Sequence, residues 1–169
     1  MHGFAAWLQG TPASNAIKTV SWLVPLLQSL HILTIGVVFV SSLMVALRVL
    51  GLMRTDESFE AVWSRFAPWI WWGLGLMAAT GLILVVAEPV REFSTLSFWM
   101  KMLLVASGVT STALYGRSLR VAARLAPVQF SVGAKTASVL IIVLWLAVIF
   151  LGRAIAYDRE VWGSLSLRT

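Results

Sequence analysis

The sequence predicts an all-α integral membrane protein, a four-helix up-down bundle with a short N-terminal interfacial helix. Of its 169 residues, 59% are hydrophobic and only 12% are charged, whereas soluble domains carry roughly 25% charged residues. Four apolar runs are each long enough to cross a bilayer, which takes about 20 residues in a helix. Because the connections between the runs are short, neighbouring helices should pack antiparallel. We expect residues 1–169 to form one transmembrane domain.

Residues 1–20 precede the first span and are predicted to form an interfacial segment. Gly3 to Gln9 is short and apolar with Trp7 at its middle, which is typical of a helix lying along the membrane surface. Thr11 and Pro12 then make a helix-start signal, a capping hydroxyl followed by proline at the first helical position.

The four predicted spans follow with little sequence between them. They cover approximately residues 22–47, 67–87, 96–116 and 132–156. In the second span Gly75 and Ala79 are four residues apart, a small-residue pattern that lets another helix approach closely. The third span is the weakest because it contains Lys101, whose side chain we expect to extend to the nearer membrane surface. The fourth has almost no polar group after Ser138 and should face lipid or a partner.

Composition excludes several classes of function. The chain has no cysteine, so disulfides and iron–sulfur clusters are ruled out. Its net charge of +6 comes from residues scattered between apolar runs, which favours anionic lipid headgroups, and not nucleic acid, as the binding partner. No nucleophile–base pair, phosphate-binding loop or metal-ligand spacing is visible in the sequence, so we do not expect an enzyme.

His31 is the most informative residue of the first span. It lies about 14 Å into the span, counted from Trp22 at 1.5 Å per residue, and an ionisable side chain at that depth indicates a functional site. Gln28, His31 and Ser42 follow the three-and-four spacing of one helix face, which Thr34 flanks. These four residues are the candidate cofactor-binding site, facing the bundle interior, and His31 is the candidate metal ligand.

Several roles for His31 stay open at this point. It is a candidate ligand of haem b or a hydrogen-bond partner of a quinone, but a bis-histidine haem needs a second histidine and the chain offers only His2. A methionine is an alternative second ligand, and the candidates are Met44, Met77, Met100 and Met102. A neighbouring subunit is another source of the missing ligand. The structural alternative is a neutral histidine bonded to a serine, a threonine or a backbone carbonyl.

Three stretches of the sequence resemble one known family. They are "WLQGTPASNAIKTVSWLVPLLQSLHILTIGVVFVSSLMVALRVLGL", a proline-led span ending in "AEPV", and "FWMKMLLVASGVTSTALYGRSL". Together they resemble the small bacterial four-helix membrane proteins of domain of unknown function 6644 (DUF6644), which are distantly similar to CopD-like, cytochrome-b-like proteins. The resemblance covers roughly Trp7 to Ala154 and implies a multi-pass protein of the bacterial inner membrane.

The sequence departs from that family at two positions. The family has an acidic residue where this chain has Ala46, and it tends to carry a histidine late in the third span, where this chain has Gly116. If the family binds haem through a pair of histidines, this chain has lost one of them. The resemblance therefore supports the fold more than any cofactor.

Two functions are compatible with these observations. The first is a non-catalytic accessory or scaffold subunit of a bacterial energy-conversion complex, respiratory or photosynthetic, with other membrane subunits as partners. The second is a cytochrome-b-like electron-transfer or quinone-interacting protein that uses His31.

Overall fold

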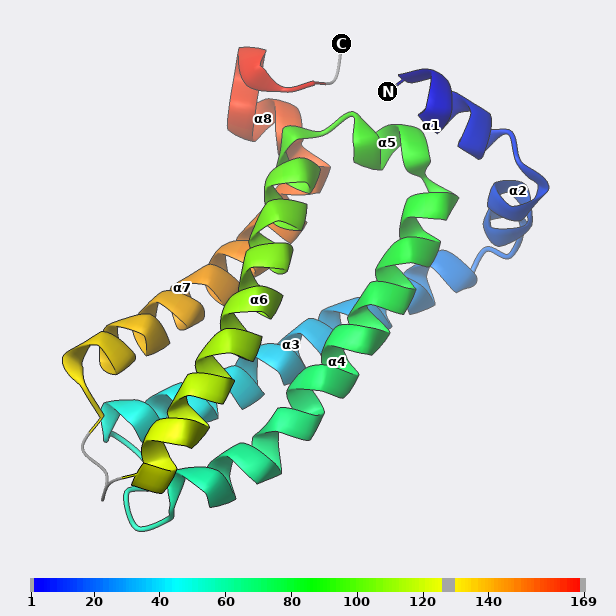
Figure 1. Cartoon of the computed structure of the whole chain (residues 1–169). Helices are drawn as coiled ribbons and strands as arrows, with labels where there is room; N and C mark the ends of the chain where they lie inside the picture. Colours follow the sequence, from blue (N-terminus) through cyan, green and yellow to red (C-terminus); the bar gives the residue numbers. More distant parts are fainter. Residues whose placement is uncertain (1, 126–129, 168–169) are drawn as a thin grey trace.

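The structure, a computed structural model, describes residues 2–125 and 130–167, and among these the elements are all helices, which confirms the all-α prediction. Its long helices alternate in direction along the chain (Figure 1). They are α3 (Leu23–Leu50), α4 (Phe59–Ala87), α6 (Leu96–Leu125) and α7 (Val132–Ala154). The shorter helices are α1 (His2–Gln9), α2 (Pro12–Thr19), α5 (Pro89–Phe93) and α8 (Asp158–Trp162), with 3₁₀ turns at Ile155–Tyr157 and Gly163–Leu165. Helices α1, α5 and α8 gather at the end of the molecule where both termini lie.

Three helical stretches are long and apolar enough to cross a membrane. They are Leu23–Leu50, Phe59–Ala87 and Val132–Leu165, the last including α7 and the short helices after it. Large apolar side chains cover their outer faces, and Ile32 and Leu33 of α3 are 66% and 67% exposed. Such exposure is favourable in lipid and costly in water. α6 is less apolar because it contains Lys101, three arginines near its end (Arg117, Arg120 and Arg124) and several hydroxyl side chains.

Three of the long helices extend beyond the predicted spans, α3 by only three residues, to Leu50. α4 begins at Phe59, not near residue 67, because the Ser58 hydroxyl caps its first turn by accepting a hydrogen bond from the Ala61 amide at 3.2 Å. Pro68, expected near the start of the span, therefore lies inside the helix. α6 continues past residue 116 to Leu125.

Helix α3 is central to the packing. It packs mainly against α4 and α7, while α6 packs mainly against α7. The close approach of α3 and α4 occurs at Gly73, where an added Cβ would lie 2.6 Å from Cγ2 of Val38. The predicted small-residue contact at Gly75 and Ala79 is wrong, since both residues are exposed and nothing lies within 4 Å of a Cβ at Gly75.

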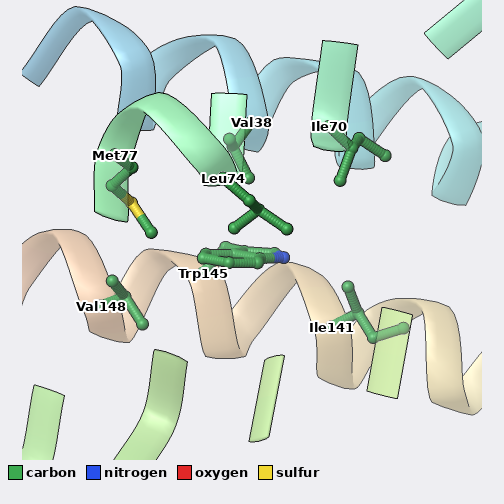
Figure 2. Close-up of a cluster of buried hydrophobic side chains, with 7 residues drawn as sticks. All are labelled: Val38, Ile70, Leu74, Met77, Ile141, Trp145 and Val148. Atoms are coloured by element: carbon green, nitrogen blue, oxygen red, sulfur yellow. The ribbon is translucent and has the colours of Figure 1, made fainter. Parts of the chain in front are cut away.

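Two apolar clusters hold the long helices together. The central cluster, drawn in Figure 2, comprises Val38, Ile70, Leu74, Met77, Ile141, Trp145 and Val148. In it the Trp145 ring lies between α7 and the Leu74 side chain. The second cluster comprises Val45, Val49, Phe59, Trp63, Ala67 and Leu119. The central cluster thus joins α3, α4 and α7, and the second joins α3, α4 and α6.

Hydrogen bonds fix the N-terminal helices and the C-terminal segment to the bundle. Thr11 caps α2 as predicted, accepting a hydrogen bond from the Ser14 amide at 3.3 Å. The fully buried Ser14 hydroxyl donates to the Ala87 carbonyl at the end of α4, at 3.4 Å. The buried Asp158 carboxylate accepts hydrogen bonds from the Ser97 amide and hydroxyl, at 3.0 and 2.7 Å. It thereby satisfies a first-turn amide of α6 that has no partner within its own helix.

We predict that Gly116→Ala destabilises the protein. A Cβ at this position of α6 would overlap the Trp63 ring of α4, and overpacking of this kind costs about 1–3 kcal/mol. The free energy of unfolding, measured by denaturant titration in lipid–detergent micelles, checks this.

The matched control is Gly75→Ala, where the added methyl meets open space. It should leave stability unchanged or raise it by up to about 1 kcal/mol, because alanine is the better helix former. Equal effects of the two substitutions would contradict the packing of Trp63 against Gly116.

Candidate functional site

His31 contacts two polar side chains from two other helices. Its Nδ1 lies 2.9 Å from Thr80 Oγ1 of α4, and its Nε2 lies 3.5 Å from Lys101 Nζ of α6. His31 itself is half-buried, while Thr80 and Lys101 are buried, with 3% and 9% of their surfaces exposed. Three helices therefore bring together one imidazole, one hydroxyl and one amine.

The hydrogen bonds of Thr80 assign the tautomer of His31. The Thr80 hydroxyl has a single proton, which we assign to the backbone because its oxygen lies 2.8 Å from the Leu76 carbonyl and 3.2 Å from the Met77 carbonyl, both of which can only accept. Its oxygen is then free to accept, so Nδ1 of His31 carries the proton and donates to it. Nε2 is left with a lone pair directed at Lys101, a donor-only group when charged. The hydrogen bonds therefore run in one direction: Lys101 donates to His31, His31 donates to Thr80, and Thr80 donates to the Leu76 carbonyl of α4.

Lys101 does not extend to the membrane surface as the sequence suggested. Its side chain is buried, and its amine lies beside Gly152 of α7, where an added Cβ would be 3.5 Å from Nζ. The carboxylate that interacts electrostatically with it is Glu92 of α5. The prediction is wrong because the Lys101 side chain turns inward toward His31, which can accept a hydrogen bond. His31 lies on α3, so the sequence of α6 alone could not reveal this acceptor.

Two glycines make room for these side chains. A Cβ at Gly81 of α4 would lie 3.2 Å from Cε1 of His31, and Gly152 of α7 adjoins Lys101. We call His31, Thr80 and Lys101, with Gly81 and Gly152, the polar site. All four long helices contribute to it.

The structure separates the four residues predicted to form one site. Gln28 is exposed, so its predicted place on the interior face is wrong. Thr34 is buried, but its hydroxyl donates to the Leu30 carbonyl of its own helix at 2.6 Å. Ser42 is buried about 16 Å further along α3 than His31, at 1.5 Å per residue. His31 alone of the four belongs to the polar site, whose other members were not predicted.

The polar site does not fit an axial ligand of haem or a bound metal ion. Both ring nitrogens of His31 contact protein groups, and the lone pair on Nε2 faces an amine. Among the described residues no group of three or more histidine or acidic side chains could hold a metal. At Gly116, where the resembling family tends to carry histidine, the Trp63 ring fills the space that a side chain would need. The side chain of His2 lies outside the described part of the chain.

Comparisons of the chain with protein-family models, curated proteins and solved structures find no match. The resemblance to domain of unknown function 6644 stays a prediction, and the geometry of the chain itself carries the functional argument.

We predict that His31→Leu lowers the free energy of unfolding by about 1 kcal/mol, the size of a hydrogen bond between membrane helices. The change removes the acceptor of the buried Lys101 amine. The double variant His31→Leu/Lys101→Met should be more stable than His31→Leu alone, because it leaves no buried amine without a partner.

Gln28→Leu is the control, on the same helix but at an exposed position, and should change stability by less than about 0.5 kcal/mol. Strictly additive effects of His31→Leu and Lys101→Met would show that the two side chains are not coupled.

Proposed function

We propose that this chain is a four-span protein of the bacterial inner membrane. Three helical stretches have the length and apolarity of spans, and α6 would be the fourth. This assignment of α6 is supported by its position alongside α7 and by its exposed apolar residues Leu103, Leu114 and Val121, each at least 59% exposed. The one charged residue in its first twenty positions, Lys101, is buried, so it would not meet lipid.

We propose further that the protein is a non-catalytic accessory subunit of an energy-conversion complex, respiratory or photosynthetic. The observation that carries this is the polar site, in which a buried amine contacts an imidazole where the four long helices meet. Burying ionisable groups within a membrane is expensive, and where it occurs it marks proton, ion or substrate handling. In this site the Lys101 amine contacts the His31 ring, and the Glu92 carboxylate of α5 interacts electrostatically with the same amine. Titratable groups held together inside the bundle are what a subunit would need to hold a proton beside a redox partner.

Quinone binding is the second candidate function. A quinone carbonyl is a hydrogen-bond acceptor, and the Lys101 ammonium has three donors, of which the contact with His31 uses one. His31 is more exposed than Thr80 and Lys101, so the polar site is least covered at His31. Haem ligation by His31 is not proposed, because it would require displacement of Lys101 from Nε2.

Gentle isolation of the tagged chain from its native membrane tests both functions. For an accessory subunit we expect fixed stoichiometry with membrane proteins that carry haem, pigment or quinone, identified by native mass spectrometry. Isolation of this chain alone under those conditions would contradict the accessory role.

The same preparation tests the cofactor. Solvent extraction and chromatography should detect bound quinone if the second function holds, with loss of the quinone in Lys101→Met and retention in Gln28→Leu. A visible spectrum with a haem Soret band that His31→Ala abolishes would overturn the arrangement described for the polar site.

A further inference from the structure

The basic residues are scattered along the sequence, but the fold gathers most of them at one end of the bundle. Figure 1 places the α3–α4 loop, the end of α6 and the start of α7 together, away from both termini. We call this the basic end. Its basic residues are Arg48, Arg54, Arg65, Arg117, Arg120, Arg124 and Lys135, and its acidic residues are Asp56, Glu57 and Glu60.

The opposite end of the bundle is balanced in charge. Apart from Lys101 of the polar site, its described residues include as many basic as acidic side chains. They are Lys18, Arg91, Arg153 and Arg159, and Glu88, Glu92, Asp158 and Glu160. The excess of positive charge therefore lies mainly at the basic end.

The acidic residues of the basic end do not neutralise the cations of α6 and α7. All three lie in the α3–α4 loop or the first turn of α4, and Glu57 already pairs with Arg54 and Arg65, at 2.5 and 3.0 Å. Residues 93–157 contain no aspartate or glutamate. Within the described part of the chain, no carboxylate forms an ion pair with the basic side chains of α6 or α7 at this end. Their charge is available to a partner.

Helix packing brings the exposed cations of α6 and α7 to a similar level. Arg117 follows directly after the close contact between α6 and the Trp63 ring of α4. Lys135 follows Ala134, whose carbonyl accepts a hydrogen bond from the Tyr115 hydroxyl of α6. The first turn of α7 therefore lies beside the turn of α6 that carries Arg117, and both cations are exposed.

The Arg120 side chain is held in place by two contacts. Its Nε donates to the Gly116 carbonyl at 3.3 Å, and its Cζ lies 5.5 Å from the centroid of the Trp63 ring. The two terminal nitrogens of the guanidinium make no hydrogen bond to other described residues. A planar guanidinium binds two phosphate oxygens at once, so a fixed one with free terminal nitrogens suits a phosphate group.

Exposed apolar side chains flank these cations along the same helix faces, at spacings of three and four residues. They are Leu114 and Val121 on either side of Arg117, and Val132 and Val139 on either side of Lys135. A partner that carries a negative group and apolar chains together would cover both kinds of side chain. Free phosphate, or the acidic surface of a soluble protein, would leave the apolar ones uncovered.

We propose that the basic end is a binding surface for anionic phospholipids, in which Arg117, Arg120 and Lys135 hold the phosphate headgroup. The acyl chains lie along the exposed apolar residues of α6 and α7. Clusters of basic residues next to a membrane span attract anionic lipids in this way. This inference rests on the four-span part of the proposed function, because it needs α6 in the membrane, and it is independent of the accessory role.

Lipid binding to the full chain in nonionic detergent micelles tests the proposal. Fluorescence anisotropy of labelled phosphatidylglycerol measures the affinity, and labelled phosphatidylcholine with the same acyl chains is the zwitterionic comparison. The wild type should bind phosphatidylglycerol at least about tenfold more tightly. Each basic side chain near an anionic lipid strengthens binding about fivefold, so Arg117→Gln/Lys135→Gln should weaken it about 25-fold.

Lys18→Gln/Arg153→Gln is the matched control. It also removes one exposed lysine and one exposed arginine, but at the opposite end of the bundle, so both double variants have the same net charge. Its affinity for phosphatidylglycerol should stay close to that of the wild type. Equal losses in the two double variants would overturn the proposal, because attraction by net charge alone does not depend on where the charges lie.

Arg120 has its own test. Arg120→Gln should weaken phosphatidylglycerol binding about fivefold, and Arg120→Lys should weaken it less, because lysine keeps the charge but loses the bidentate geometry. Wild-type affinity in Arg120→Gln would overturn the assignment of this side chain to the headgroup.

Two further measurements separate the possible partners. Inorganic phosphate should compete poorly with phosphatidylglycerol, and competition as effective as that of unlabelled lipid would overturn the lipid as the ligand. Release of the reconstituted chain from phosphatidylcholine vesicles by alkaline carbonate would overturn the four-span proposal and this one with it. Retention in the vesicles with no preference for phosphatidylglycerol would overturn the lipid site alone and favour an acidic protein as the partner of the basic end.

Discussion

The packing of α3 between α4 and α7 is the contact on which the rest of the structure depends. Val38 packs directly over Gly73, and its position sets how closely α3 and α4 approach. Along α3, His31 lies before Val38 of the central cluster and Ser42 lies after it. A small shift of α3 along its axis would move His31 and Ser42 together, because protein interiors are close-packed and have no free space to absorb the shift.

The interior of the bundle changes from polar to apolar along its length. The polar site is followed by the central cluster and then by the second apolar cluster. The two ionisable side chains that lie inside the bundle, His31 and Lys101, are both at the polar site. There, neighbouring helices supply their partners and glycines supply room, Gly81 for His31 and Gly152 for Lys101.

Sequence spacing predicted an inward-facing His31 but chose the wrong neighbours for it. Leu27, His31, Thr34, Val38, Ser41 and Val45 make the stripe that the structure turns inward. The predicted stripe shares His31 and Val38 with this one, and Ser42 is buried as predicted, but Gln28 is exposed. Spacing alone cannot show which edge of the face is covered, because both stripes satisfy the helical period. The packing of α3 against α4 and α7 decides it.

The sequence by itself determined the all-α class, the apolar helices, the capped start of α2 at Thr11 and the presence of an ionisable residue deep in α3. These features follow from composition, from the length of the hydrophobic runs and from local capping, and none of them depends on which helices pack together. Three further features depend on the tertiary structure: Lys101 turns inward, Thr80 contacts the imidazole, and Gly116 lies against the Trp63 ring. Those facts depend on how helices far apart in sequence rotate and cross, and side-chain packing between them sets that geometry.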